Sequence, residues 1–94
     1  HTASLFPHQT NFDDDCLALI AKHPESGQIR ISKSAKLIAQ AKRITYLVTG
    51  ESKAAILKEI QTQNAEQLPY PAAKIKAQNG ITEWYLDKAA AQLL

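Results

Sequence analysis

Apolar and polar residues follow one another in two rhythms along the chain, and each rhythm predicts a different kind of element. Runs rich in apolar, β-branched or aromatic residues, bounded by turn residues, predict strands at 16–21, 43–49 and 82–86. A shorter extended piece is expected at 29–32. The run at 16–21 is apolar almost throughout, which is typical of a strand buried on both faces of a parallel sheet.

Apolar residues at helical spacing fill most of the segments between these strands. The longest such segment is 51–64. Ser34 is expected to cap a second helix, and Asp87 is expected to cap a third over 88–94. Turn-forming and irregular stretches complete the chain, with an acidic turn at 13–15, loops at 23–28, 68–71 and 79–80, and a short extended piece over 72–77.

The alternation of strands and helices predicts one α/β domain over residues 1–94. Strands that are separated by helical segments form crossovers, and crossovers produce a mainly parallel sheet. We therefore expect a three-layer arrangement in which helices flank both faces of this sheet. Three short helices give thin cover to one of the faces, so a further segment is expected to complete it.

The composition is that of an ordinary soluble globular protein, with 45% apolar and 21% charged residues and a net charge of +2. The basic residues are spread from Lys22 to Lys88, whereas a nucleic-acid surface needs clustered charge, so no nucleic-acid partner is expected. The apolar runs are far shorter than the roughly 18 residues of a membrane span, so no membrane association is expected. The lone Cys16 is expected to be a small apolar residue in a reducing compartment.

A candidate site lies where the strand 43–49 turns into the helix 51–64, at Thr49-Gly-Glu-Ser-Lys53. The carboxyl end of a strand is the usual ligand side of an open α/β sheet, and the first N–H groups of a helix favour an anion. A positive charge at Lys53 opposes the helix dipole unless an anion is bound there. Lys53 is therefore either a phosphate-binding residue or a solvated surface lysine, and the spacing of a P-loop is absent.

Arg30 and the histidines supply the remaining candidate chemistry. Arg30 lies in an extended segment, where its guanidinium either holds a phosphate or is an exposed edge charge. His1, His8 and His23 have neither the spacing nor the cysteine partners of a zinc site, so no metal is expected. From its position alone, His1 is expected to be frayed and inert.

Taken in order, these segments resemble the 6-phosphogluconolactonase family. The opening His1-Thr-Ala-Ser-Leu-Phe-Pro7 is similar to the second half of that family's Gly-x-Asp-Gly-His-Thr-Ala-Ser-Leu-Phe-Pro signature. The resemblance covers essentially the whole chain, and the opening heptapeptide is its most specific part. Four further matches follow downstream, at Arg30-Ile-Ser32, Tyr46-Leu-Val-Thr-Gly-Glu-Ser-Lys53, Leu68-Pro-Tyr-Pro-Ala72 and Thr82-Glu-Trp-Tyr-Leu-Asp87.

The resemblance implies the C-terminal part of a Rossmann-like sugar-phosphate isomerase/lactonase fold that works without a cofactor or metal. It implies hydrolysis of 6-phosphogluconolactone to 6-phosphogluconate in the pentose phosphate pathway, in the cytoplasm. His1 matches the general base that activates water against the lactone carbonyl. Lys53 and Arg30 match the positive residues that hold the 6-phosphate of the substrate, which accounts for a lysine in the first turn of a helix.

The match stops short at its N-terminal side. The family's Gly-Gly-x-Thr/Ser phosphate loop and the Gly-x-Asp-Gly before the histidine are not found in residues 1–94, and Lys33-Ser-Ala stands where the family often has an apolar stretch. We therefore expect residues 1–94 to be the C-terminal domain of a longer lactonase and to be inactive alone. The sheet edge left uncovered is then expected to favour a homodimer.

Two other functions are compatible with these residues. A glucosamine-6-phosphate deaminase shares the fold, but its corresponding segment reads His-Ile-Ala-Phe-Asn-Glu, where this chain has Thr2, Ser4 and Leu5. Ammonia release from glucosamine 6-phosphate would identify that activity. A non-catalytic module that binds a phosphorylated sugar is the second alternative. The discriminating observation is the gene, since a reading frame found to continue upstream of His1 into Gly-x-Asp-Gly would argue against this alternative.

Overall fold

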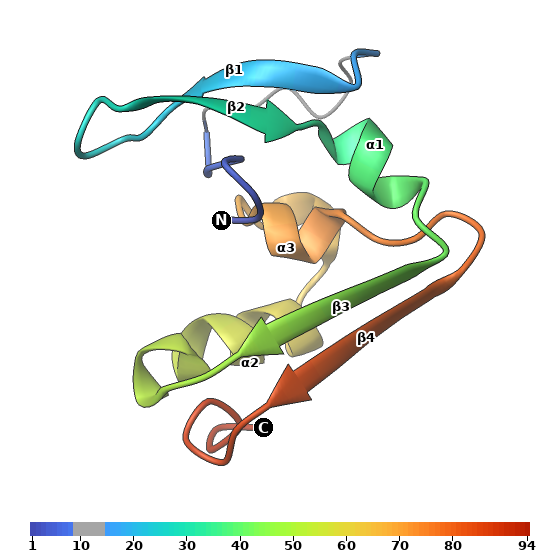
Figure 1. Ribbon diagram of the computed structural model, residues 1–94. Helices are drawn as coiled ribbons and strands as arrows, with labels where there is room; N and C mark the ends of the chain where they lie inside the picture. Colours follow the sequence, from blue (N-terminus) through green and yellow to red (C-terminus); the bar gives the residue numbers. More distant parts are fainter. Residues whose placement is uncertain (9–14) are drawn as a thin grey trace.

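The computed structural model describes residues 1–8 and 15–94, and its four strands form two separate two-stranded sheets (Figure 1). Figure 1 shows one sheet at each end of the molecule, with the N-terminal turn and a short helix between them. Asp13 and Asp14 of the predicted acidic turn lie outside the described residues. The strands are β1 (Ala18–Lys22) and β2 (Ile29–Lys33), which pair antiparallel, and β3 (Arg43–Val48) and β4 (Ile81–Leu86), which pair in parallel.

The helices are short and fall mainly between the strands of the parallel pair. No helix in the described part of the chain is long and apolar enough to cross a membrane. The α-helices are α1 (Ala35–Ala39), α2 (Ala54–Thr62) and α3 (Pro71–Lys74), and the 3-10 turns are η1 (Glu51–Lys53) and η2 (Ala65–Gln67).

The β1–β2 hairpin corrects the prediction of one mainly parallel sheet. Only the loop 23–28 joins the two strands, and a parallel connection needs a crossover of about a dozen residues or more. Gly27 turns this loop with a φ of 72°, and the His23 ring nitrogen Nδ1 accepts hydrogen bonds from the N–H groups of Glu25 and Ser26. The loop is therefore too short for anything but an antiparallel pair.

The predicted double burial of the strand 16–21 is also wrong. Ile20 is 76% exposed and pairs with Ile31, which is 83% exposed, so one face of the hairpin is open. The other face carries Ser32, which is buried against the N-terminal turn. The hairpin thus has one covered face, as antiparallel pairs commonly do.

The parallel prediction is confirmed for β3 and β4. Their register runs from Arg43 opposite Ile81 to Val48 opposite Leu86, and the connection between them contains α2 and α3. The face that carries Ile44 packs into the core, whereas Leu47 on the opposite face is 76% exposed. The described residues therefore form a small α/β unit whose parallel pair is covered on one face.

The sequence predicts some of the helices correctly and misses others. The Ser34 cap is confirmed, since its Oγ accepts the Leu37 N–H at 3.0 Å. The helix predicted over 51–64 begins as a 3-10 turn and ends at Thr62. The extended piece predicted over 72–77 is wrong for 72–74, because Pro71 fits the first position of a helix and starts α3, whereas Ile75 after the helix is extended.

The predicted C-terminal helix is also wrong, since residues 88–93 form turns and no helix. Asp87 does cap the first of these turns, because its Oδ1 accepts the Ala90 N–H at 2.7 Å. The sequence therefore predicts the cap at Asp87 correctly but wrongly predicts that a helix follows it.

The hydrophobic core joins the N-terminal turn to the parallel pair. Leu5 is fully buried and packs with Ile44 of β3 and Ile75, which follows α3. The predicted turn at Asn79-Gly80 closes beside the core, and a Cβ at Gly80 would lie 2.1 Å from the Lys42 carbonyl oxygen, so only glycine fits. The core therefore ties the first residues of the chain to β3, which leads to the Lys53 turn.

Candidate functional site

The turn that carries His1 is fixed by backbone contacts and by a buried anchor. Thr2 and Leu5 exchange two backbone hydrogen bonds of 3.1 and 2.9 Å across the turn, and Ala3 adopts a positive φ of 52°. The Ser4 N–H donates to the buried Ser32 hydroxyl of β2 at 3.1 Å. Because Leu5 is fully buried, the turn is held in the core rather than frayed, which corrects the expectation for an isolated N-terminal residue.

The His1 imidazole is positioned by an aromatic neighbour. Its ring stacks on Phe6, with 5.3 Å between the ring centroids and 23° between the planes. The His23 ring packs edge-on against the same Phe6 at 5.1 Å. Phe6 is itself buried, so it limits the movement of the His1 ring on the side where the two rings stack.

Lys53 is placed by the turn that follows β3. The strand ends at Val48, and Gly50 reverses the chain with a φ of 97° and a ψ of 149°, a conformation that favours glycine. The Lys53 N–H then donates to the Gly50 carbonyl oxygen at 3.3 Å, which closes η1 immediately before α2. The lysine therefore sits at the carboxyl end of the parallel pair, where the sequence predicts a ligand site.

His1 and Lys53 line the same cavity, which has a volume of about 360 Å³. Tyr46 and Trp84 form one wall, with ring centroids 4.3 Å apart and 15° between the planes. The hydroxyl of Tyr46 donates to the Ile75 carbonyl oxygen at 2.8 Å. The remaining lining comes from β3, from α2 and from the turn around α3, at Leu47, Val48, Thr49, Ile56, Leu57, Ile60, Tyr70 and Ala72.

The charges at this cavity favour an anion. Burial raises the pKa of the Tyr46 phenol, so this side chain stays protonated and keeps its hydrogen bond to Ile75. An apolar cavity with a lysine at its edge attracts a negatively charged group and strengthens its binding.

Arg30 does not reach this cavity in the structure. It lies on β2, and its Nε donates to the Gln28 side-chain oxygen at 2.9 Å. Arg30 is on the same face of β2 as Ser32, the residue that contacts the N-terminal turn. The structure thus brings two of the three predicted site residues together and leaves the third on the neighbouring hairpin.

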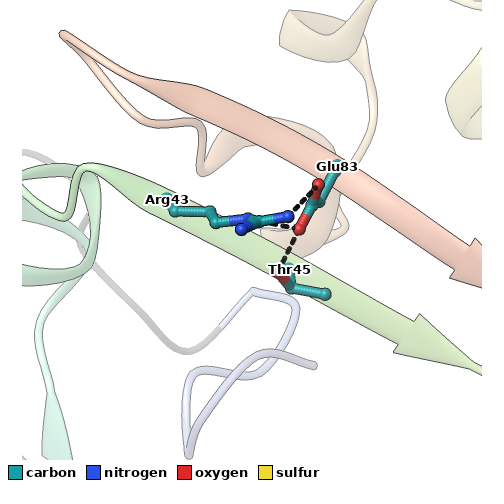
Figure 2. A network of polar contacts seen from close by, with 3 residues as sticks. All are labelled: Arg43, Thr45 and Glu83. Carbon is teal, nitrogen blue, oxygen red and sulfur yellow. Dashed lines mark hydrogen bonds and ion pairs between the residues drawn. The ribbon is translucent and has the colours of Figure 1, made fainter.

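A separate polar network lies on the opposite face of the parallel pair (Figure 2). Arg43 forms two hydrogen bonds to the Glu83 carboxylate at 2.7 and 3.1 Å, and the Thr45 hydroxyl donates to the same group at 2.7 Å. Hydrogen bonds from Arg43 and Thr45 lower the pKa of Glu83. Side chains alternate along a strand, so this network faces away from the wall formed by Tyr46 and Trp84.

Sequence reasoning missed three residues of the site region. Tyr46 and Trp84 are named from sequence only within the motifs of the resemblance, and Asp87 is expected only to cap a helix. The structure pairs Tyr46 with Trp84 in the β3–β4 register and brings Asp87 to the turn after β3. A signal was present, because the carboxyl ends of parallel strands meet at one edge of a sheet.

Comparison with known proteins matches most of this chain to one family. The family model described as glucosamine-6-phosphate isomerases/6-phosphogluconolactonase matches residues 1–84. A 6-phosphogluconolactonase of Haemophilus influenzae is 86% identical over the whole of this chain, which corresponds to 40% of that protein's length. The chain therefore spans well under half the length of such a relative.

Solved structures agree with the sequence relatives. The crystal structure of the devB protein matches with a TM-score of 0.93 and 60% identity, over 96% of this chain and 38% of that one. The 6-phosphogluconolactonase of Trypanosoma brucei matches with a TM-score of 0.83 and 27% identity, over 100% of this chain and 38% of that one. The fold of the described residues is thus one that these longer proteins contain.

Proposed function

Since the chain belongs to the glucosamine-6-phosphate isomerase/6-phosphogluconolactonase family, we propose that the polypeptide containing these residues hydrolyses 6-phosphogluconolactone to 6-phosphogluconate. The observation that carries the proposal is the cavity shared by His1 and Lys53, which places a base and a cation on one substrate-sized space. Close relatives that are named 6-phosphogluconolactonase favour the lactone over an amino sugar as substrate.

His1 acts as the general base in this proposal. Its imidazole accepts a proton from a water molecule while the water oxygen attacks the lactone carbonyl carbon. When the ring C–O bond breaks, the imidazolium returns that proton to the departing oxygen. The stacking on Phe6 supports this role, because proton transfer requires the ring to be held in place.

Lys53, which lines the same cavity, holds the phosphate of the substrate. Its ammonium contributes a charge-assisted hydrogen bond that is the same before and during the reaction, so it acts on binding rather than on the chemical step. Arg30 is proposed as a second phosphate residue, supported by its place on the face of β2 that meets the His1 turn. Its guanidinium must leave Gln28 to take that role.

Lys53→Ala is expected to raise KM for 6-phosphogluconolactone by about 10- to 100-fold, the value of one hydrogen bond to a charged group, and to leave kcat nearly unchanged. The unphosphorylated gluconolactone has no group for Lys53 to hold, so its kcat/KM should not change. Steady-state kinetics of the complete polypeptide with both lactones measures the difference. Lys58→Ala, an exposed lysine on α2, is the matched control. Equal losses with both lactones would contradict the assignment.

We also propose that residues 1–94 form the C-terminal domain of a three-layer, Rossmann-like lactonase of the cytoplasm. The open face of the parallel pair supports this fold, since Leu47, Ile81 and Tyr85 are 76%, 62% and 54% exposed there. Polypeptide outside these residues would cover that face. Where it does not, the same face and the free strand edges would favour a homodimer.

Residues 1–94 expressed alone are expected to show negligible lactonase turnover. Among the described residues, the cavity offers the phosphate one lysine, and relatives that carry the lactonase name are more than twice as long. Production of 6-phosphogluconate by this segment, assayed beside the complete polypeptide, measures the difference. Circular dichroism of the segment serves as a folding control. Comparable turnover by a folded segment would overturn the expectation.

A further inference from the structure

We infer that Asp87 is a positioning residue whose carboxylate fixes the Gly50 turn and thereby places Lys53 at the cavity. The inference rests on the proposed function, because it assigns Lys53 a phosphate to hold. Asp87 itself is not among the residues that line the cavity in the described chain, so it acts through its neighbours.

The contacts of Asp87 all converge on the turn at the carboxyl ends of β3 and β4. The Gly50 N–H donates to both carboxylate oxygens, at 3.1 Å each. The Ala90 N–H donates to Oδ1 at 2.7 Å, which holds the carboxylate from the other side. The Asp87 N–H donates to the Val48 carbonyl oxygen at 3.4 Å, so the parallel ladder itself aligns Asp87 with the turn.

Gly50 needs such a partner because its conformation is not fixed by its own side chain or surroundings. A Cβ at Gly50 would meet no atom within 4 Å, so nothing packs against the turn at this point. Glycine has wide backbone freedom, and its φ of 97° is held by external contacts. The carbonyl oxygen of Gly50 accepts the Lys53 N–H at 3.3 Å, so a single residue links the Asp87 carboxylate to the lysine backbone.

The negative charge of Asp87 indicates that this residue can favour anion binding only by positioning other groups. A carboxylate at this edge repels a phosphate and also occupies an N–H group that an anion would otherwise use. Both effects oppose anion binding, so the residue favours binding only by placing Lys53. Asn at this position retains an oxygen acceptor without the charge, whereas Ala removes the acceptor altogether.

The test compares Asp87→Ala and Asp87→Asn in the complete polypeptide. Asp87→Ala should raise KM for 6-phosphogluconolactone about five- to tenfold, with kcat within about twofold of wild type, because loosening Lys53 weakens uniform binding. Asp87→Asn should remain within about twofold in KM, since its amide oxygen replaces the acceptor. Asn64→Ala, which removes the side-chain cap on the Glu66 N–H and does not change a residue that lines the cavity, is the matched control and should change neither constant.

Two further readouts separate this inference from the proposed function. Amide hydrogen exchange at Gly50 should become at least about tenfold faster in Asp87→Ala, and the affinity for inorganic phosphate should fall in parallel. Gly50→Ala strains the same turn, because a side chain disfavours its φ of 97° even though no neighbouring atom lies within 4 Å of the added Cβ, and it should reproduce the phosphate effect if Asp87→Ala does not fold. A polypeptide with no lactonase turnover would defeat the proposed function, whereas the phosphate and exchange results would still decide the role of Asp87. Unchanged phosphate affinity in a variant with faster Gly50 exchange, or unchanged exchange in Asp87→Ala, would overturn the inference.

Discussion

His1→Asn is expected to lower kcat for 6-phosphogluconolactone by about 10²- to 10⁴-fold, the usual contribution of a general base. Asn approximates the size and polarity of the imidazole but cannot accept a proton from water. KM should change little, because Lys53, which lines the same cavity, still binds the phosphate. The measurement is steady-state kinetics of the complete polypeptide at saturating lactone.

Two controls make the His1 result specific. His8→Asn changes an exposed histidine and should leave kcat unaffected. Thermal unfolding of His1→Asn should match that of wild type, because the turn is anchored by Leu5 and the backbone rather than by the imidazole. A folded His1→Asn variant with kcat within about tenfold of wild type would exclude His1 as the base.

Leu5→Ala is expected to destabilise the fold by about 2–5 kcal/mol, the range for a large-to-small change in a tight core. Leu5 is fully buried, and its contacts with Ile44 and Ile75 connect the N-terminal turn to β3 and to the segment after α3. The same change should lower kcat, because the turn that loses its anchor is the one that positions His1. Denaturant unfolding and kinetics on the same preparation measure both effects.

The matched control for Leu5 is an exposed leucine. Leu47 is 76% exposed on the open face of the parallel pair, so Leu47→Ala should change the free energy of unfolding by less than about 0.5 kcal/mol. If Leu5→Ala is too unstable to assay, Leu5→Val should show smaller losses of stability and of kcat in the same direction. A variant that loses stability but keeps wild-type kcat would mean that the anchor and the base are independent.

The elements that the sequence predicts correctly are those whose signals are local. The strands β3 and β4 are rich in β-branched and aromatic residues, and the Ser34 side-chain oxygen accepts a hydrogen bond from the N–H three residues later. The hairpin was missed because an apolar run resembles a buried parallel strand until the loop that follows it is measured. The length of the loop 23–28, rather than the composition of β1, decides the antiparallel pairing.

Only the site residues that belong to a single sequence motif could be predicted. Lys53 stands at the carboxyl end of a strand, and the resemblance of the opening segment singles out His1, so both were named from sequence. The facts that needed the structure concern register and distance. Trp84 meets Tyr46, and Asp87 meets Gly50, because β4 lies beside β3 in parallel, which no local pattern encodes.

The most direct measurement is the release of 6-phosphogluconate by the complete polypeptide, with kcat and KM determined for wild type, His1→Asn and Lys53→Ala. If one cavity holds both a base and a phosphate-binding cation, the two variants should each change a different kinetic constant. His1→Asn should lose kcat and keep KM, and Lys53→Ala should keep kcat and raise KM. No release of 6-phosphogluconate by wild type, or unchanged kinetics in both folded variants, would contradict the assignment of this cavity as the lactonase site.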